Sequence, residues 1–287
     1  MATPVRIALV VHPKRDIDDS LATLRRWAEA QGVEIVQVGD GHREVAPRGE
    51  AADGDLVVAL GGDGTALAAL RMAIAPQAPV LGVACGSLGA LSAVPGSELE
   101  SALERVWSGD WVARPLPALS IDVVEGTGHW AVNDLVVIRR GAGQVAVDIA
   151  VDGELYARLA GDGLIVATPL GSSAYSMAAG GPVLAAGTPG FVCTPLAMHG
   201  GSAPPLVVPA DAEATIVVHP GFAGFDLEID GQERAASGER FQVRLHPGKV
   251  TLVAFDTPSR GLTGLRRRRL ITDSPRILAR DERAKRT

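Results

Sequence analysis

In the first third of the chain, short apolar runs of strand length alternate with stretches of helical spacing. Apolar residues such as Leu21, Leu24 and Ala28 recur at the spacing of a helix that buries one face. The predicted strands cover residues 7–11, 33–38, 56–60 and 80–83, and the later predicted helices cover residues 65–75 and 98–107. Residues 56–60 are apolar at every position, which is typical of a strand buried on both faces. The pattern predicts an α/β domain with a parallel sheet covered by helices.

After about Arg114 the pattern changes to many short strand-like runs separated by glycine and proline. These runs cover residues 120–124, 130–138, 145–151, 155–159, 164–167, 206–208, 215–218, 226–229 and 239–245. Helical spacing is scarce there, apart from a short predicted helix after Gly171. We therefore expect a C-terminal all-β, sandwich-like domain.

The prolines in residues 115–117 mark the expected domain boundary. We expect three parts: an α/β domain with a phosphate loop at 1–115, the β-sandwich-like domain at 116–255, and a basic C-terminal segment at 256–287. The last segment is expected to be helical and to return to the first domain.

Composition favours a cytoplasmic protein. The chain has 287 residues, 47% of them hydrophobic, so it can bury a large core without metals or disulfides. Its two cysteines, Cys85 and Cys193, are far apart in the sequence and have no neighbours at metal-ligand spacing, which favours reduced thiols in a cytosol. The apolar run at 7–11 is too short for a signal peptide or a membrane span.

Charge is distributed unevenly along the chain. The net charge is −6, but from Pro258 onward ten Lys and Arg face three Asp and Glu, a local balance of +7 that leaves −13 for the rest. A solvated helix end explains this basic segment better than nucleic-acid binding, because no aromatic residue follows Phe255 to stack on bases. We expect neither a nucleic-acid partner nor a membrane partner.

The segment Gly61-Gly62-Asp63-Gly64-Thr65 lies between a predicted buried strand and a predicted helix. Glycines there let backbone N–H groups approach an anion, and the helix N-terminus adds partial positive charge. Asp63 could hold Mg²⁺ or accept the proton of an attacking hydroxyl. The alternative is a plain tight turn with Asp63 as a helix cap. Because the glycines fit neither G-x-G-x-x-G nor the Walker pattern, this would be a different phosphate loop.

A second glycine turn, residues 86–89, follows the next predicted strand and would lie beside the first, as a phosphate-side wall or a structural turn. The segment 161–182 places an acidic glycine turn with Asp162 and a hydroxyl-rich turn ending in Tyr175 around one strand. Such a set suits a nucleoside, although it also fits a turn-rich corner of a β domain.

Two short polar motifs could add to such a site. Asn133 and Asp134 could clamp a ribose diol or form an ordinary turn. Residues 230–232 are primarily a signal for a β-hairpin turn, and a role in the site is the secondary interpretation.

Taken together and in this order, the motifs resemble the NAD kinase family. The matching elements are the GGDGT loop at 61–65, Gly86 with residues 88–89, residues 133–134, the block GDGLIVATPLGSSAYSMAAGGP at 161–182, and residues 229–232. The GGDGT loop is shared with lipid kinases and phosphofructokinase-like enzymes, whereas the 161–182 block together with the upstream Asn-acid pair is highly specific. The resemblance covers about residues 5–255.

The resemblance implies a kinase that phosphorylates the 2′-hydroxyl of the adenosine ribose of NAD to give NADP, using ATP or polyphosphate and a divalent cation such as Mg²⁺. It also implies a site between the two domains, and a homo-oligomer, a dimer or a tetramer, in which NAD can contact two subunits. The implied catalytic residue is Asp63, the residues facing the phosphates are Gly61, Gly62, Gly64 and Thr65, and those binding NAD are Asn133, Asp134, Asp162, Ser173, Ala174, Tyr175 and Gln232.

The sequence departs from the family pattern at five positions: Ala84, Asp134, Leu170, Ser173 and Pro204. Ala84 and Leu170 each replace a polar residue that would line the expected site. They motivate one alternative, a catalytically altered paralogue that only binds a dinucleotide. A second alternative is a lipid kinase sharing the GGDGT loop, which the hydroxyl-rich turn at 171–176 disfavours because acyl chains need an apolar cleft.

Overall fold

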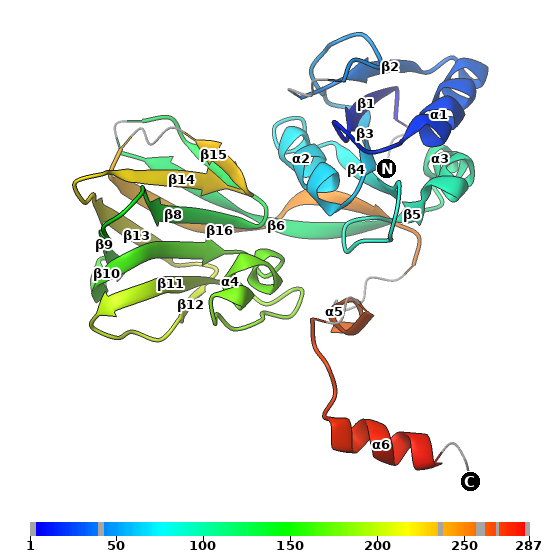
Figure 1. The fold of residues 1–287 in the computed structure, drawn as a ribbon. Coiled ribbons are helices and arrows are strands. Elements are labelled where there is room, and N and C mark those ends of the chain that lie inside the picture. Colours follow the sequence, from blue (N-terminus) through cyan, green and yellow to red (C-terminus); the bar gives the residue numbers. More distant parts are fainter. Residues whose placement is uncertain are drawn as a thin grey trace.

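The structure, a computed structural model, shows two domains joined by two long strands (Figure 1). It describes residues 4–39, 43–124, 126–234, 238–256, 262–267 and 270–284. Within these residues, all the strands belong to one continuous sheet, which is parallel in the N-terminal domain and antiparallel in the C-terminal domain.

The N-terminal domain is an α/β domain, as predicted. Its strands are β1 (Arg6–Val11), β2 (Glu34–Gln37), β3 (Asp55–Gly61), β4 (Pro79–Ala84) and β5 (Val94–Pro95), and its helices are α1 (Asp18–Gln31), α2 (Asp63–Ala73), the short η1 (Gly96–Glu98) and α3 (Leu99–Ser108). The strands β2, β1, β3 and β4 lie side by side in that order, all parallel. Their carboxyl ends therefore meet at one edge, where ligands of such sheets bind.

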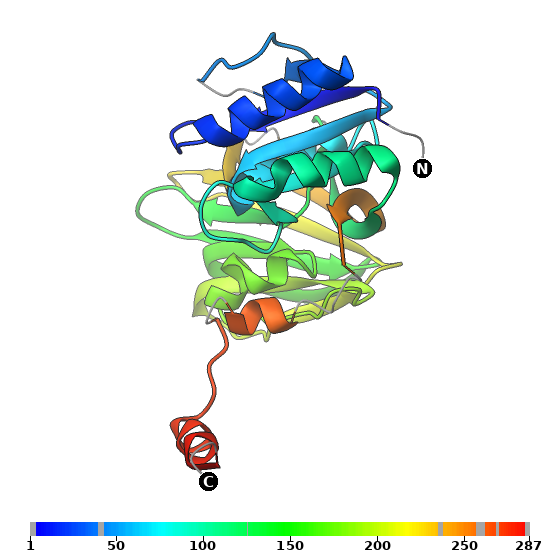
Figure 2. The same ribbon diagram turned by 90° about the vertical axis from the view of Figure 1, so that its right-hand side faces the viewer.

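Helices cover both faces of this parallel sheet. Helices α1 and α3 share one face (Figure 2), and α2 covers the opposite face. Along β3, Leu56 and Val58 pack under α1 and α3, whereas Val57 and Ala59 pack under α2. Because successive side chains of a strand point to opposite faces, a strand covered on both sides must be apolar throughout. This explains the continuous apolar run at 56–60.

The C-terminal domain is rich in antiparallel strands, also as predicted. Its strands are β6 (Val112–Val123), β7 (His129–Ala131), β8 (Asp134–Arg139), β9 (Val145–Val151), β10 (Glu154–Ala167), β11 (Gly190–Gly200), β12 (Leu206–Pro209), β13 (Glu213–His219), β14 (Phe225–Ile229), β15 (Gln232–Arg234) and β16 (Arg240–Ala254). The inward-facing side chains form one core that includes the fully buried Phe191 and Phe241. The short helices η2 (Gly171–Ser173) and α4 (Tyr175–Ala178) follow β10, where a short helix was predicted.

Several strand predictions in this domain need correction. Residues 130–138 form two strands, β7 and β8. The chain is interrupted between them because the N–H groups of Val132 and Asn133 donate to the Asp230 carboxylate instead of a neighbouring strand. Residues 155–159 and 164–167 belong to one strand, β10, and Gly161 and Gly163 within it lie against neighbouring backbone. Strand β11 was missed, although its apolar start at Phe191 is a strand signal.

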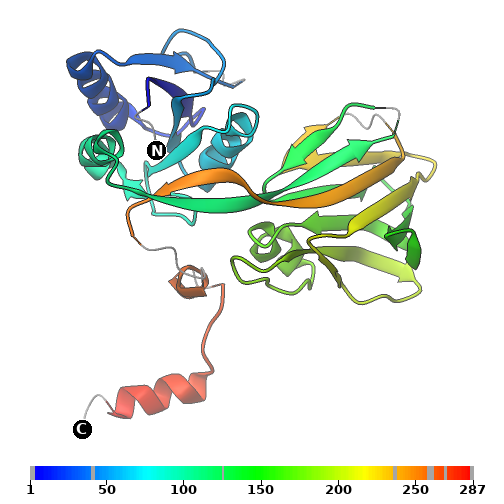
Figure 3. The same cartoon turned by 180° about the vertical axis from the view of Figure 1, so that it is seen from behind.

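Strands β6 and β16 connect the two domains (Figure 3). Strand β16 pairs with β6 along its length and, at Thr251, with β4 of the N-terminal domain. Pro115 and Pro117 lie inside β6, and the register of β16 shifts between His246 and Val250, opposite Pro117. Because proline has no N–H to donate, an irregularity in the partner strand accommodates it at this position.

Two helices, α5 (Leu262–Arg267) and α6 (Pro275–Ala284), follow β16. Leu265 of α5 is buried, whereas α6 lies apart from both domains (Figures 1 and 3). In the described part of the chain, no helix is both long enough and apolar enough to cross a membrane.

Candidate active site

The GGDGT loop forms the junction between β3 and α2. Strand β3 ends at Gly61, Gly62 is extended, and α2 begins at Asp63. A Cβ at Gly61 would lie 2.2 Å from Oγ1 of Thr65, so glycine is required for this close turn. The first N–H groups of a helix have no partner within the helix, and here they face the carboxyl edge of the sheet.

Asp63 is not the helix cap, which was the alternative interpretation of this loop. Its Oδ2 accepts the N–H of Ala90 at 2.9 Å and its Oδ1 accepts the N–H of Leu91 at 3.0 Å. A Cβ at Gly89 would lie 1.9 Å from Oδ1 of Asp63. The second glycine turn therefore lies beside the first, as predicted, and it fixes the orientation of the Asp63 carboxylate. Each carboxylate oxygen retains a further lone pair for a ligand.

A cleft of about 340 Å³ opens beside this carboxylate. It is lined by residues of both domains, including His12, Arg15, Asp63, Thr65 and Gln232. Gln232 is the first residue of β15, so the cleft lies between the GGDGT loop and the C-terminal domain.

His12 and Arg15 were missed by sequence reasoning. Nδ1 of His12 accepts the N–H of Arg15 at 2.9 Å, and the Arg15 guanidinium donates to the carbonyl of Cys85 at 3.3 Å. Arg15 thus spans the first and second glycine turns with its charge in the cleft. The available signal was position, because both residues follow β1 at the same sheet edge as the loop.

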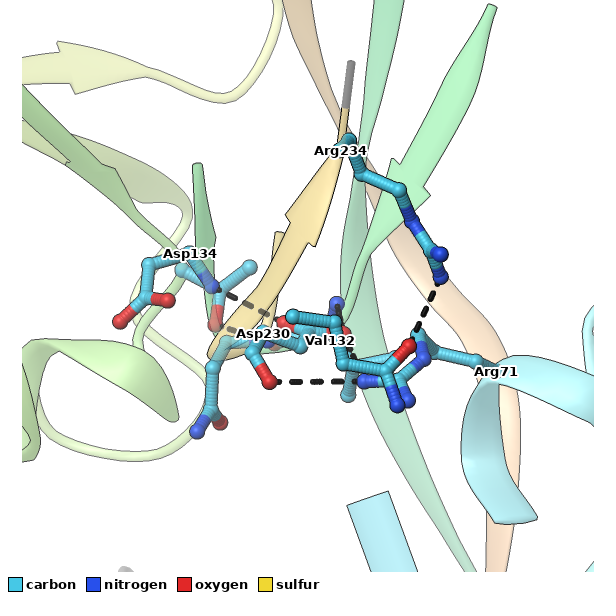
Figure 4. A network of polar contacts seen from close by, with 8 residues as sticks. Arg71, Val132, Asp134, Asp230 and Arg234 are labelled. Carbon is cyan, nitrogen blue, oxygen red and sulfur yellow. Dashed lines mark hydrogen bonds and ion pairs between the residues drawn. The ribbon is translucent and has the colours of Figure 1, made fainter. Parts of the chain in front are cut away.

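A second polar cluster holds Asp134, the first residue of β8, together with the preceding Asn133. Figure 4 shows Asp134 beside Asp230. The Asp230 carboxylate accepts three successive N–H groups, those of Val132 at 3.0 Å, Asn133 at 2.6 Å and Asp134 at 3.1 Å. The hairpin signal at 230–232 is correct, since β14 and β15 pair around it, and Asp230 adopts a left-handed backbone with φ of 52°. Its carboxylate also orders the 132–134 segment.

Two of these carboxyl groups are buried, and burial raises both their pKa values. The pKa of Asp134 rises to about 7, first because burial disfavours its charge and then because Asp230 and Glu228 repel it. The pKa of Asp230 is raised by burial too, although its three backbone hydrogen bonds and Arg71 oppose the shift. The pKa of Arg71 is lowered, mainly by burial.

The hydroxyl-rich corner at 168–175 lies against this cluster. The N–H of Thr168 donates to the carbonyl of Asn133 at 2.9 Å, and its hydroxyl donates to the carbonyl of Val132 at 2.7 Å. A Cβ at Gly171 would lie 2.1 Å from the Asn133 carbonyl oxygen. The hydroxyl of Ser173 donates to a backbone carbonyl at 3.2 Å, while Ala174 and Tyr175 are exposed.

Two of the departures from the family pattern, Ala84 and Leu170, have structural explanations. Leu170 packs against the apolar cluster under α2, and Ala84 is 2% exposed at the end of β4. The carbonyl of Pro204 accepts the Tyr156 hydroxyl at 2.7 Å. Ala84 and Leu170 thus fill apolar space.

Asp162 lies apart from Asn133 and Asp134, although all three were predicted to bind NAD. Ala167 of β10 pairs with Asp134, and five residues of strand at about 3.3 Å each put Asp162 roughly 16 Å away along β10. There it forms ion pairs with Arg139 and with His199, the latter at 3.4 Å. The hydrogen bond from Arg139 is the main reason why the pKa of Asp162 is lowered.

No group of three or more His, Cys, Asp or Glu side chains that could hold a metal ion occurs among the described residues. Of the described residues lining the cleft, Asp63 is the one that carries a carboxylate. Mg²⁺ usually binds one or two carboxylates, several waters and substrate phosphates. The cleft fits such an ion only if the substrate supplies most of its ligands.

Comparisons with known proteins agree with this architecture. The family model of the ATP-NAD kinase N-terminal domain matches residues 24–111, and that of the ATP-NAD kinase C-terminal domain matches residues 132–255. An NAD kinase of Gemmatimonas aurantiaca is 36% identical over 207 residues, covering 69% of this chain and 72% of the relative. An NAD kinase of Koribacter versatilis is 35% identical over 240 residues, covering 79% and 84%.

Solved structures show the same fold. Yeast NADH kinase complexed with NADH superposes with a TM-score of 0.79 at 22% identity, covering 95% of this chain and 89% of that one. An NAD kinase from Archaeoglobus fulgidus in complex with ATP gives a TM-score of 0.68 at 23% identity, covering 90% and 97%. With both family models matched in order over most of its length, and with relatives more than a third identical, this chain belongs to the ATP-NAD kinase family.

Proposed function

We propose that this protein is an NAD kinase, which transfers the γ-phosphoryl group of ATP to the 2′-hydroxyl of the adenosine ribose of NAD. The observation that carries the proposal is the cleft lined both by Asp63, at the start of α2, and by Gln232 of the C-terminal domain. Two substrates can meet there, one on the phosphate loop and one on the β domain. The names of the relatives, NAD kinases throughout, support the same reaction.

The phosphates of the donor would lie on the N-terminus of α2. Backbone N–H groups of Gly62 and Gly64 and the helix dipole favour negative charge there, and Arg15 adds a full positive charge. Phosphoryl transfer depends chiefly on positioning and charge stabilisation, so such a set can supply much of the catalysis.

Asp63 would accept the proton of the acceptor hydroxyl. The 2′-oxygen attacks the γ-phosphorus, the bond from that phosphorus to the bridging oxygen breaks, ADP leaves, and the proton goes to the Asp63 carboxylate. The hydrogen bonds from Ala90 and Leu91 hold this carboxylate in one orientation. A magnesium ion bound by the phosphates, with Asp63 nearby, would supply further charge neutralisation.

The acceptor would lie on the β domain. Asn133 and Asp134 would bind the ribose, because the Asp230 hydrogen bonds hold their backbone rigidly at the edge of β8. Ser173, Ala174 and Tyr175 would border the adenine, since their turn is tied to Asn133 through Thr168.

Asp162 would contact NAD from a second subunit. Its position roughly 16 Å along β10 from the Asp134 pairing is too far for it to contact the ribose that Asn133 and Asp134 would bind. In a homo-oligomer, Asp162 of a neighbouring chain could lie at the cleft and contact the bound NAD. Cytoplasmic location and the choice between ATP and polyphosphate stay predictions.

The test is NADP formation by the purified protein with ATP, Mg²⁺ and NAD, measured with an NADP-specific dehydrogenase. Asp63→Asn should lower kcat by about 10²–10⁴-fold, the usual contribution of a positioned general base. The matched control is Asp53→Asn, which removes an exposed carboxylate and should leave activity unchanged. Absence of NADP from the wild-type protein with both ATP and polyphosphate would refute the proposal.

A further inference from the structure

One buried ion pair links the helix of the phosphate loop to the β domain. Nη1 of Arg71, in α2, lies 3.6 Å from Oδ2 of Asp230 and 3.5 Å from the Asp230 carbonyl oxygen. The Arg71 side chain is 10% exposed and that of Asp230 is fully buried. The two residues are 159 positions apart in the sequence (Figure 4).

The same carboxylate orders the proposed ribose-binding segment. Oδ1 of Asp230 accepts the N–H groups of Asn133 and Asp134, and Oδ2 accepts that of Val132 while facing Arg71. One side chain therefore holds both the backbone of the acceptor side and the guanidinium from the donor side. A shift of Arg71 would shift the carboxylate that positions Asn133 and Asp134.

Helix α2 connects this ion pair to the reacting groups. Asp63 is the first residue of α2 and Arg71 is eight residues later, about 12 Å along the axis. A helix of this length behaves as a rigid rod, so anchoring Arg71 restrains where Asp63 lies relative to Asn133 and Asp134.

Holding the domains together does not require this ion pair. An apolar cluster already packs Leu67 and Leu70 of α2 with Leu116, Val132 and Val250 of the connecting region. Such packing is non-directional, and a buried ion pair adds little net stability because both charges lose water. The hydrogen bonds of the Asp230 carboxylate are directional, so they fix the relative positions of the groups that they join. This fits a role in alignment.

We propose that Arg71 and Asp230 are positioning residues for the phosphoryl transfer: the pair sets the distance between Asp63 and the acceptor ribose on Asn133 and Asp134. The inference rests on the proposed function. Neither side chain lines the cleft beside Asp63, so the pair acts on alignment and hence on kcat.

The first experiment compares Arg71→Met with Arg71→Lys at a temperature well below the unfolding midpoint of the weaker variant. Loss of alignment by about 1 Å can cost up to about 100-fold, so Arg71→Met should lower kcat by about 10- to 100-fold while the KM for ATP stays within about twofold. Arg71→Lys should recover part of the loss. Arg26→Met, at an exposed position on α1, is the matched control and should retain wild-type kcat.

A double-mutant cycle tests whether Arg71 and Asp230 act as one unit. Asp230→Asn should lower kcat, and Arg71→Met should add little in the Asp230→Asn background, because either change alone breaks the connection. Fully additive losses, or an Arg71→Met variant within twofold of wild-type kcat, would overturn the inference.

Hydrogen exchange provides a readout that does not depend on activity. In Arg71→Met, the amides of Val132, Asn133 and Asp134 should exchange faster than in wild type, while those of the β9–β13 pairing should be unchanged. Unchanged exchange at 132–134 would also overturn the inference. If the wild-type protein made no NADP, the proposed function would fail, whereas this exchange comparison would still decide whether the pair couples the domains.

Discussion

Asp134 shows how burial gives one side chain an unusual titration. Buried next to Asp230 and Glu228, its carboxyl group has a pKa of about 7, against 3.8 in the unfolded chain. Near neutral pH it can therefore either accept or donate a hydrogen bond, and both ribose hydroxyls could use it. The sequence shows an acidic residue next to Asn133, but its neighbours come from distant segments, so its pKa could not be predicted.

The raised pKa predicts a specific pH dependence of stability. Between pH 3.8 and about 7, native Asp134 keeps a proton that the unfolded chain releases, so this group's contribution to stability falls as pH rises through that window. Asp134→Asn should remove this pH-dependent contribution to stability. The variant should therefore gain stability relative to wild type at pH 8 but not at pH 4.

Urea unfolding at several pH values measures this difference, and subtracting the wild-type curve cancels the titrating groups that do not interact with Asp134. Asp211→Asn, at an exposed carboxylate of the β domain, serves as the control. Parallel pH profiles for wild type and Asp134→Asn would contradict the prediction.

Two glycine turns form one functional element, although each follows a different strand. The turn after β4 supplies the N–H groups of Ala90 and Leu91 to Asp63, the first residue of α2. The parallel order of β3 and β4 brings the turns together, and this much follows from the sequence pattern. Which residues face each other does not follow, because it depends on the path of the second turn.

Gly89→Ala tests this element directly. Its new Cβ would lie 1.9 Å from Oδ1 of Asp63, so the carboxylate or the turn must move, and we expect kcat to fall by up to about 100-fold with the fold retained. Gly264→Ala, where a Cβ meets no atom within 4 Å, should behave as wild type. Thermal unfolding checks the fold, and a Gly89→Ala variant with wild-type kcat would show that the contact is dispensable.

At the level of the full protein, the cleft collects residues from both domains, but Asp162 is directed elsewhere. Its ion pairs with Arg139 and His199 hold it on the β10 surface of the C-terminal domain. If it binds NAD, it does so for a neighbouring subunit, and an active site would then contain parts of two chains.

Mixing two defective variants tests this arrangement. Asp63→Asn and Asp162→Ala should each lower activity, but hybrid oligomers should contain intact sites with Asp63 from one chain and Asp162 from the other. For a two-fold symmetric dimer with free exchange, about a quarter of wild-type activity should return. Activity no greater than the average of the separate variants, with exchange shown by mass spectrometry, would rule the arrangement out.

Hydrophobic periodicity and glycine-rich turns are local features of a few residues. The sequence alone was therefore sufficient to predict the α/β domain, the antiparallel β domain and the glycine loop between β3 and α2. The strand limits near Pro117 and the contacts of Arg15 and Arg71 could not be obtained in this way. Each depends on a partner far along the chain, as Arg71 does on Asp230, 159 residues away. Only folding sets such distances, because the energy of a polar contact depends on geometry and burial that no local pattern contains.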